Sequence, residues 1–183
     1  MEINRKIKEA RLERGYTLDE LARATQLTKG YLSKIERSAN VPPFSTLETI
    51  AVALNLNLAG LLEKPRGSAV TKNIDVFTRT EHSPLTESTA GYAYQALVRE
   101  YQRKYMSPFL FQIKKGWTKY FKHDGEEFVY MLEGNVTLEY EAHRYALGKG
   151  DSFYLDSRIK HRFWNAREKP ALLLAVNYTY RRF

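Results

Sequence analysis

The stretch that most constrains the fold of this chain runs from Thr17 to Arg37 and reads TLDELARATQLTKGYLSKIER. Thr17 is suited to cap a helix, because Glu20 three residues later can complete a capping box. Thr28 is suited to cap a second helix, whose apolar positions fall three residues apart and give it one inward face. The residues between them, roughly Thr25 to Leu27, are left for a tight turn. The stretch therefore predicts two short helices joined by that turn.

The outward side of the second predicted helix is polar and basic. It carries Lys29, Tyr31, Ser33, Lys34 and Arg37. When such a helix pair docks on DNA, the start of the second helix meets base edges and nearby cations hold phosphates. Gly30 costs a helix about 1 kcal/mol relative to alanine, and we expect it to allow close approach of the backbone to DNA. The pattern predicts a DNA-reading helix, with an ordinary amphipathic helix pair as the alternative.

Further helical patterns flank this pair. Ile3 to Gly15 should form a helix that stops at the glycine, and Ser45 should cap a helix that runs to Leu54. A short helix should follow at about Leu58 to Leu62. We therefore predict a five-helix bundle over residues 1–63.

The N-terminal third also contains a set of specific motifs. They are Arg11, Thr17 to Ala22, Ser33 to Arg37, Pro42 to Leu47, and Ala53 with Leu54. Together they resemble the Xre family of phage-repressor-like helix-turn-helix domains. The resemblance implies a structural pair between Arg11 and Glu36. It also implies base-reading side chains at the start of the second motif helix and further contacts along it, which here means Thr28, Lys29, Gly30 and Tyr31, then Ser33, Lys34 and Arg37.

One position departs from the family pattern. The family often places a glutamine that holds a phosphate where this chain has Leu18. That contact would have to come from Thr17 or from backbone amides at the helix start.

The chain has 183 residues, enough for two domains that each bury a core. Helical periodicity ends after Leu62, and the polar, Pro- and Gly-containing run from Glu63 to Ser68 is typical of a linker. We expect residues 64–105 to hold the linker and leading strands, with a β-rich domain at 106–183. Residues 1–66 hold 11 Lys and Arg against 8 Asp and Glu, although the whole chain has a net charge of +8. Net charge therefore supports an acidic partner less well than the local grouping of cations on the second motif helix.

Composition excludes several classes of protein. The chain has no cysteine, which excludes disulfides, thiolate catalysis and cysteine zinc sites. Its N-terminus is charged and lacks the apolar run of a signal peptide, and no stretch has membrane-spanning length. We therefore expect a cytoplasmic protein with no membrane partner.

Beyond Met106, short runs rich in aromatic and β-branched residues alternate with glycine turns. The predicted strands are Phe109 to Ile113, Glu127 to Leu132, Val136 to Tyr140, Ser152 to Leu155, His161 to Trp164 and Leu172 to Tyr178, preceded by Tyr92 to Val98. Many short strands at this spacing predict a sandwich or closed barrel.

Four features of this region stand at informative spacings. They are Gly116 with His123 to Glu127, Gly134, Gly150 with Asp151, and His161 with Asn165. Over about Pro108 to Tyr178 they resemble the two motifs of the cupin superfamily. The resemblance implies a jelly-roll β-barrel that holds a ligand or metal in its mouth. The second motif departs from the pattern, because Asp156 and Arg158 replace its usual proline and glycine.

The cupin resemblance also implies a ligand set. Metal-binding cupins generally use three histidines and a glutamate, and the matching positions here are Phe121, His123, Glu127 and His161. Two histidines and one carboxylate can form a facial site for Fe(II) or a similar ion, but Phe121 brings apolar bulk where a ligand is normally required. We expect these four residues, with Tyr130, to line an organic effector pocket and no cofactor to be bound. A divalent metal at His123, Glu127 and His161, or a merely structural cluster, remain the alternatives.

Taken together, the two halves predict a sequence-specific transcriptional regulator, a repressor, that is not an enzyme. Its partners would be a double-stranded DNA operator, a small-molecule effector and a second copy of itself in a homodimer. The first alternative is a cupin oxygenase or isomerase with an accessory DNA-binding domain. The second is an antitoxin-like protein whose barrel binds a protein partner.

Overall fold

The computed structural model describes residues 2–56, 58, 61, 74, 76, 78, 84–98 and 105–178. Four helices lie in these ranges: α1 (Glu2–Glu13), α2 (Leu18–Thr25), α3 (Lys29–Arg37) and α4 (Phe44–Ala53). The predicted fifth helix falls where the structure describes only Leu58 and Leu61, both with helical backbone. The count of five helices is therefore not confirmed.

The capping chemistry sets the bounds of the motif helices. Thr17 and Glu20 form the full capping box of α2, and the Thr28 hydroxyl accepts the backbone N–H of Tyr31 to cap α3. Gln26 ends α2 in the left-handed conformation at φ 56° and turns the chain toward α3. The prediction that Ser45 caps the next helix is wrong. Helix α4 begins at Phe44 with Pro43 before it, because the proline presets an extended backbone at that position.

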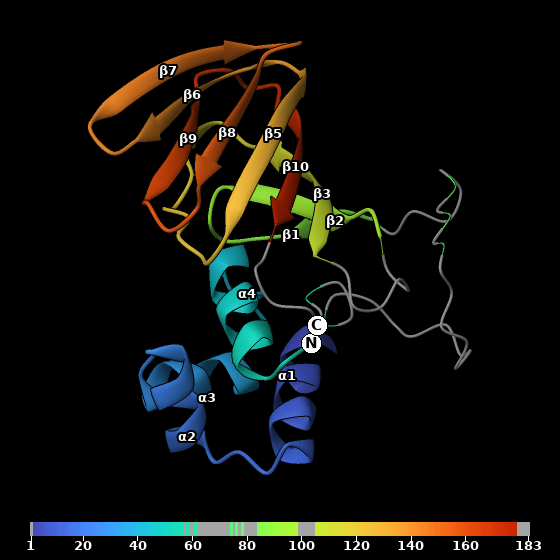
Figure 1. The fold of residues 1–183 in the computed structure, drawn as a ribbon, viewed down its shortest axis with the longest axis vertical. Helices are drawn as coiled ribbons and strands as arrows, with labels where there is room; N and C mark the ends of the chain where they lie inside the picture. The colour runs from blue at the N-terminus through green and yellow to red at the C-terminus, as the bar shows by residue number, and fades with distance from the viewer. Residues whose placement is uncertain are drawn as a thin grey trace.

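The C-terminal part consists of strands that form two antiparallel sheets. The strands are β1 (Thr86–Glu87), β2 (Tyr92–Ala96), β3 (Met106–Ile113), β4 (Gly116–Trp117), β5 (Glu126–Glu133), β6 (Asn135–Tyr140), β7 (His143–Gly148), β8 (Ser152–Asp156), β9 (His161–Asn165) and β10 (Ala171–Tyr178). The larger sheet has the order β1-β2-β3-β10-β5-β8, and the smaller has the order β4-β9-β6-β7. The two sheets face each other above the helices, with β6, β7 and β9 on one side (Figure 1).

Three of these strands differ from the sequence prediction. β1 lies within Glu81 to Gly91, a stretch whose proline, serine and threonine residues suggest a loop. β4 begins at Gly116, which was predicted to form a turn, and β7 begins within Glu141 to Arg144, where the sequence suggests a hairpin turn. β7 was not recognisable, because its first four residues are all exposed and show no apolar alternation. The sequence also suggests a strand at Asn73 to Phe77, but this range lies mostly outside the described residues.

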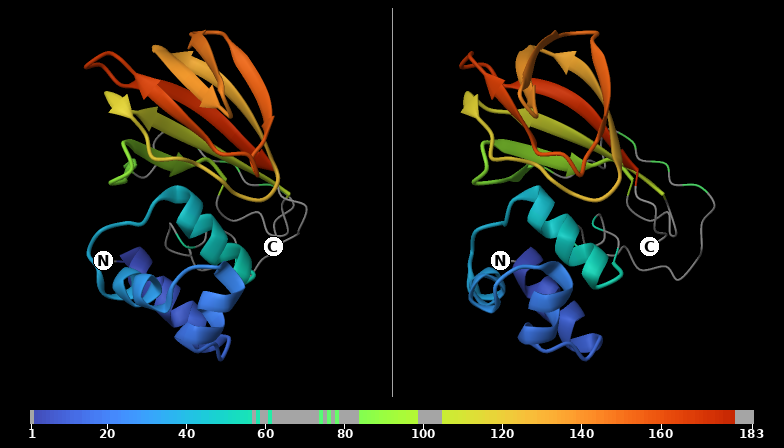
Figure 2. Two further views of the ribbon diagram at one scale, coloured as in Figure 1. Left: turned by 90° about the vertical axis from the view of Figure 1, so that its left-hand side faces the viewer. Right: turned by 60° about the vertical axis from the view of Figure 1, so that its left-hand side comes forward.

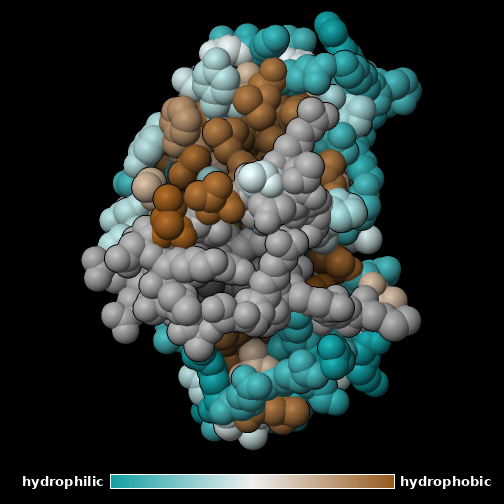
Figure 3. Space-filling view, turned by 90° about the vertical axis from the view of Figure 1, so that its right-hand side faces the viewer, coloured by the Kyte–Doolittle hydropathy of each residue, from teal (hydrophilic) through white to brown (hydrophobic). Residues whose placement is uncertain are grey.

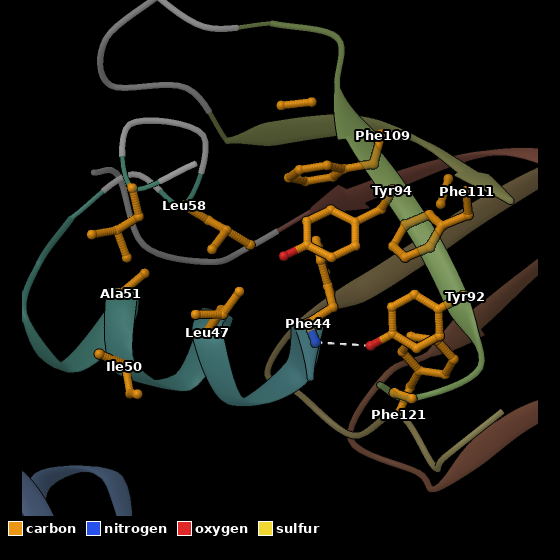
Figure 4. Packing of buried hydrophobic residues seen from close by; sticks show 14 of the residues in the cluster. Phe44, Leu47, Ile50, Ala51, Leu58, Tyr92, Tyr94, Phe109, Phe111 and Phe121 are labelled. Carbon is orange, nitrogen blue, oxygen red and sulfur yellow. Dashed lines mark hydrogen bonds between the residues drawn. The ribbon is translucent and has the colours of Figure 1, made fainter. Parts of the chain in front are cut away.

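Helix α4 lies between the other helices and the strands in every view (Figures 1 and 2). Its Phe44 points into aromatic side chains of the larger sheet, while Ile50 points the other way (Figure 4). The buried hydrophobic residues accordingly form one cluster that extends from Ile3 in α1 to Ala175 in β10. α4 therefore belongs to the cores of both halves. Among the described residues, no helix combines the length and apolar character needed to cross a membrane.

Candidate functional site

Helix α3 presents the predicted DNA-reading face to solvent. Thr28, Lys29, Gly30, Tyr31, Lys34 and Arg37 are exposed and Ser33 is half-buried, whereas Leu32 and Ile35 are buried on the opposite side. A Cβ atom added at Gly30 would meet no heavy atom within 4 Å. Packing within the protein therefore does not require a glycine there.

Two of the predicted contact residues already have partners within the protein. The Lys29 ammonium lies 2.7 Å from the Asp19 carboxylate, and both side chains are well exposed. The Thr17 hydroxyl accepts the Glu20 N–H at 3.2 Å, and the Thr17 N–H donates to the Glu20 carboxylate at 2.7 Å. Exposed ion pairs contribute little free energy, so Lys29 is readily released, whereas Thr17 is held by its capping role.

Arg11 and Glu36 lie beneath this surface and join α1 to α3. The Arg11 Nε and Nη2 atoms donate to the two Glu36 carboxylate oxygens at 2.6 and 3.0 Å, and Nη1 donates to the Tyr16 carbonyl at 2.7 Å. Glu36 also raises the pKa of Arg11, chiefly through this hydrogen bonding. The two-pronged geometry fixes the orientation of α3 relative to α1.

Inside the strand domain, His123, Glu127 and His161 come together and are buried. Glu127 projects inward from β5, His161 begins β9, and His123 lies in the segment that leads into β5. The Glu127 Oε2 atom lies 3.6 Å from His123 Nε2 and 3.4 Å from His161 Nε2. Both histidines therefore direct the same ring nitrogen toward one carboxylate oxygen.

The opposite ring nitrogens have partners of different origin. His161 Nδ1 lies 2.9 Å from the Ile159 carbonyl, in its own domain. His123 Nδ1 lies 3.4 Å from the carbonyl of the neighbouring Asp124 and 3.1 Å from Glu48 Oε2, and Glu48 belongs to α4. The other Glu48 oxygen accepts a hydrogen bond from Asn177 Nδ2 at 3.4 Å. Sequence reasoning missed Glu48, although it is the one charged residue in the α4 sequence FSTLETIAVA.

The structure places the two predicted aromatic pocket residues differently. Phe121 is buried and its ring stacks on the His161 ring, with centroids 5.6 Å apart. The expectation for Tyr130 is wrong, because this residue lies on the outer face of β5 and is 40% exposed. Side chains alternate along a strand, so a residue three positions after Glu127 points to the opposite face.

Charge in the cluster follows from burial and from these contacts. Burial raises the pKa of Glu127, but the imidazoles of His123 and His161 outweigh it and lower the value to about 2. Burial lowers the pKa of His123, whereas Glu48 and then Glu127 raise it, to about 9 overall. Burial is also the main influence on Glu48 and raises its pKa. Glu127 is therefore held as a carboxylate, the form in which it can bind a cation, whereas His123 must lose a proton before its Nε2 can coordinate one.

The donor set of the cluster fits a divalent metal ion. One ligand atom from each of His123, Glu127 and His161 lies within 4.8 Å of the others. His161 Nε2 is buried without a hydrogen-bond partner, and its Nδ1 contact with Ile159 favours the tautomer that leaves Nε2 free to coordinate. Two histidines and a carboxylate are the ligand set of facial Fe(II) sites. These three residues can therefore hold a metal.

Comparisons with known proteins agree with this two-part architecture. A family profile described as "Helix-turn-helix" (HTH_3) matches residues 7–61, and a profile described as "Cupin domain" matches residues 109–177. The chain is 26% identical over 167 residues to the HTH-type transcriptional regulator PuuR of Escherichia coli strain K12, covering 88% of this chain and 86% of that protein.

Two solved structures resemble the fold over nearly the whole chain. An HTH_3 family transcriptional regulator from Vibrio cholerae has a TM-score of 0.68 at 20% identity, covering 97% of this chain and 95% of that one. Hydroxypropylphosphonic acid epoxidase from S. wedmorenis has a TM-score of 0.51 at 21% identity, covering 96% of each chain. The sequence motifs, the capped helix pair, the two-sheet domain and both profile matches lead to one conclusion: the chain belongs to the Xre-type (HTH_3) helix-turn-helix family and carries a C-terminal domain of the cupin family.

Proposed function

We propose that the protein is a sequence-specific DNA-binding transcriptional regulator whose cupin domain binds a ligand that modulates operator binding. The observation that carries this proposal is the exposed face of α3, with its capped start, its open Gly30 and its cations Lys34 and Arg37 further along. The start of such a helix meets base edges and the later cations contact phosphates. The similarity to the regulator PuuR over 88% of the chain supports the same function.

Binding-site selection from random duplex DNA tests the DNA-reading face. The wild-type protein should return one consensus sequence, and Lys29→Ala and Tyr31→Ala should each return a changed one, because these side chains stand at the start of α3. Lys149→Ala, an exposed lysine in the turn after β7, serves as the control and should leave the consensus intact. An identical consensus from all four proteins would refute this assignment of the reading face.

A homodimer would give this regulator two reading helices about 34 Å apart, one DNA turn, on a near-palindromic operator.

The outer face of the larger sheet is the surface that we assign to the dimer contact. In the strand register, Leu110, Leu174 and Tyr130 form one cross-strand row, and Pro108, Val176, Phe128 and Tyr154 form the next. Tyr130, Phe128 and Tyr154 are 40%, 38% and 65% exposed. Figure 3, which views the molecule from this side, shows hydrophobic residues gathered over the cupin domain. Exposed apolar patches of this kind mark interaction surfaces.

The dimer proposal is tested by molar mass in solution. Tyr130→Glu places a charge at the centre of the patch and should yield a monomer that binds the operator weakly. Tyr145→Glu makes the same change at an exposed tyrosine of the smaller sheet and should remain a dimer. A dimeric Tyr130→Glu protein, or a monomeric wild type, would contradict the assignment.

If the ligand of the cupin domain is a metal ion, a second candidate function is a metal-dependent cupin enzyme. The observation that favours it is the buried group of His123, Glu127 and His161, whose donor set fits a metal. We propose that any metal bound there serves regulation, because PuuR, similar over most of the chain, is named a regulator. Metal analysis of the purified protein by mass spectrometry, with His161→Ala as the comparison, tests occupancy. Consumption of dioxygen by the Fe(II)-loaded protein would instead favour the enzyme.

A further inference from the structure

The His123 ring joins the two domains of the protein. Its Nε2 atom faces Glu127 inside the cupin domain, at 3.6 Å from the carboxylate. Its Nδ1 atom faces Glu48 of α4, at 3.1 Å. Helix α4 is at the same time part of the helical core, through buried Leu47 and Ile50. One imidazole is therefore in contact with the candidate metal ligands on one side and with the helix-turn-helix domain on the other.

We propose that Glu48 is a positioning residue for a divalent-cation site, so that the helix-turn-helix domain supplies the carboxylate that orients the ligand His123. A metal-binding histidine almost always donates its second ring N–H to a carboxylate or a carbonyl, which fixes its tautomer and increases its basicity. His161 has such a partner in the Ile159 carbonyl, 2.9 Å away. His123 Nδ1 lies 3.4 Å from the Asp124 carbonyl of its own domain but closer, at 3.1 Å, to Glu48 Oε2, so its carboxylate partner comes from a different domain.

The surroundings of Glu48 support this role over a purely structural one. Glu48 is buried, and a buried carboxylate costs several kcal/mol unless charges and hydrogen bonds compensate it. Its compensating contacts are His123 and Asn177, and Asn177 is paired with Glu127 in the register of β10 and β5. Both contacts thus lie next to the candidate ligands.

The docking of α4 holds Glu48 in place. The Phe44 N–H, in the first turn of α4, donates to the Tyr92 hydroxyl of β2 at 2.8 Å (Figure 4). The Phe44 ring packs edge-on against Tyr94, Phe109 and Phe111. Glu48 is one helical turn further along α4, on the same face as Phe44. The position of α4 therefore determines whether His123 has its carboxylate partner.

Coupling between the two domains follows from this arrangement. A cation at His123, Glu127 and His161 binds more tightly when α4 is docked, so by linkage it also favours the docked position of α4. Any effect of the cation on operator binding rests on the proposed regulatory function. The role of Glu48 in cation binding does not rest on that function, and this role can be tested without DNA.

Calorimetric titration of the full-length, metal-free protein with Co²⁺ tests the inference. Removing such a carboxylate partner typically weakens metal affinity 10–100-fold. We expect a loss in this range for Glu48→Ala and a smaller one for Glu48→Gln, which keeps the shape and an accepting oxygen. Glu9→Gln, a change of the same charge at an exposed position of α1, should bind Co²⁺ like the wild type.

Three measurements make the result decisive. Circular dichroism establishes that each variant is folded, and if Glu48→Ala does not fold, Glu48→Gln carries the test. The visible spectrum of bound Co²⁺ should change in the Glu48 variants, since a residue that only stabilised the fold would leave the coordination unaltered. Equal Co²⁺ affinity and equal spectra for wild type and both variants would overturn the inference, as would a wild type that binds no Co²⁺. Operator binding by the metal-free wild type is measured separately, so that a failure of the regulatory proposal is recognised on its own.

Discussion

Replacing Phe44 by alanine should weaken the packing of α4 against the larger sheet, so that the two domains no longer unfold together. The side chain is 1% exposed, and its ring centroid lies 5.2, 4.8 and 5.1 Å from those of Tyr94, Phe109 and Phe111 in edge-on geometry. Removing a buried phenylalanine costs about 3–5 kcal/mol, because apolar contacts are lost and a cavity remains. All three ring partners belong to strands of the larger sheet, so this loss falls on the docking of α4 and leaves the contacts among α1, α2 and α3 in place.

Urea unfolding followed by two probes measures this loss. Both tryptophans, Trp117 and Trp164, lie in the cupin domain, so their fluorescence reports that domain, while far-UV circular dichroism also reports the helices. The two transitions should coincide in the wild type and separate in Phe44→Ala, with total stability lower by about 3–5 kcal/mol. Leu12→Ala, at a 57% exposed position of α1, should change stability by less than about 0.5 kcal/mol. A Phe44→Ala loss below about 1 kcal/mol with coincident transitions would refute the docked position of α4.

Three further substitutions test the helix-turn-helix domain. Gly30→Ala should raise stability by up to about 1 kcal/mol, since alanine favours the helix, yet weaken operator binding in a fluorescence anisotropy titration; unchanged DNA affinity would mean that DNA does not approach this backbone. Glu36→Ala should lower stability by about 3 kcal/mol in thermal unfolding, because it leaves the buried Arg11 charge unpaired, and an unaltered melting temperature would count against the pair. Lys34→Ala should weaken binding to all DNA sequences alike and reduce the salt slope by about 1; a slope equal to that of the wild type would remove its phosphate contact.

The helix-turn-helix domain could be predicted closely because its signals are local. A capping box depends on residues three apart, and Thr17, Glu20 and Thr28 occupy the positions expected of them. Strands bounded by glycine turns could be predicted for the same reason. β7 could not, because it forms an edge of the smaller sheet and its exposed side chains carry no apolar alternation.

The candidate cluster shows where local reasoning ends. The positions of His123, Glu127 and His161 in the cupin motifs were enough to predict that they meet. The prediction of Tyr130 in the pocket was wrong, because it neglected the two-residue period of the strand that carries Glu127. The contact between His123 and Glu48 joins residues 75 positions apart in different domains, and no local pattern encodes it. The sequence signal that could have identified Glu48 is that it is the one charged residue in α4.

A nearly complete switch of DNA binding by the proposed coupling requires that two protomers act together. A 10–100-fold change in cation affinity through Glu48 corresponds to about 1.4–2.7 kcal/mol per protomer. Moving a two-state equilibrium from 1:99 to 99:1 requires about 5.5 kcal/mol. Two equivalent sites in a dimer supply about 3–5 kcal/mol, which approaches that requirement, whereas one site reaches at most about half of it. Co²⁺ should therefore change operator affinity strongly in the wild type and only weakly in the Tyr130→Glu protein, and an equal response of the two in anisotropy titrations would show that the dimer is not the unit of regulation.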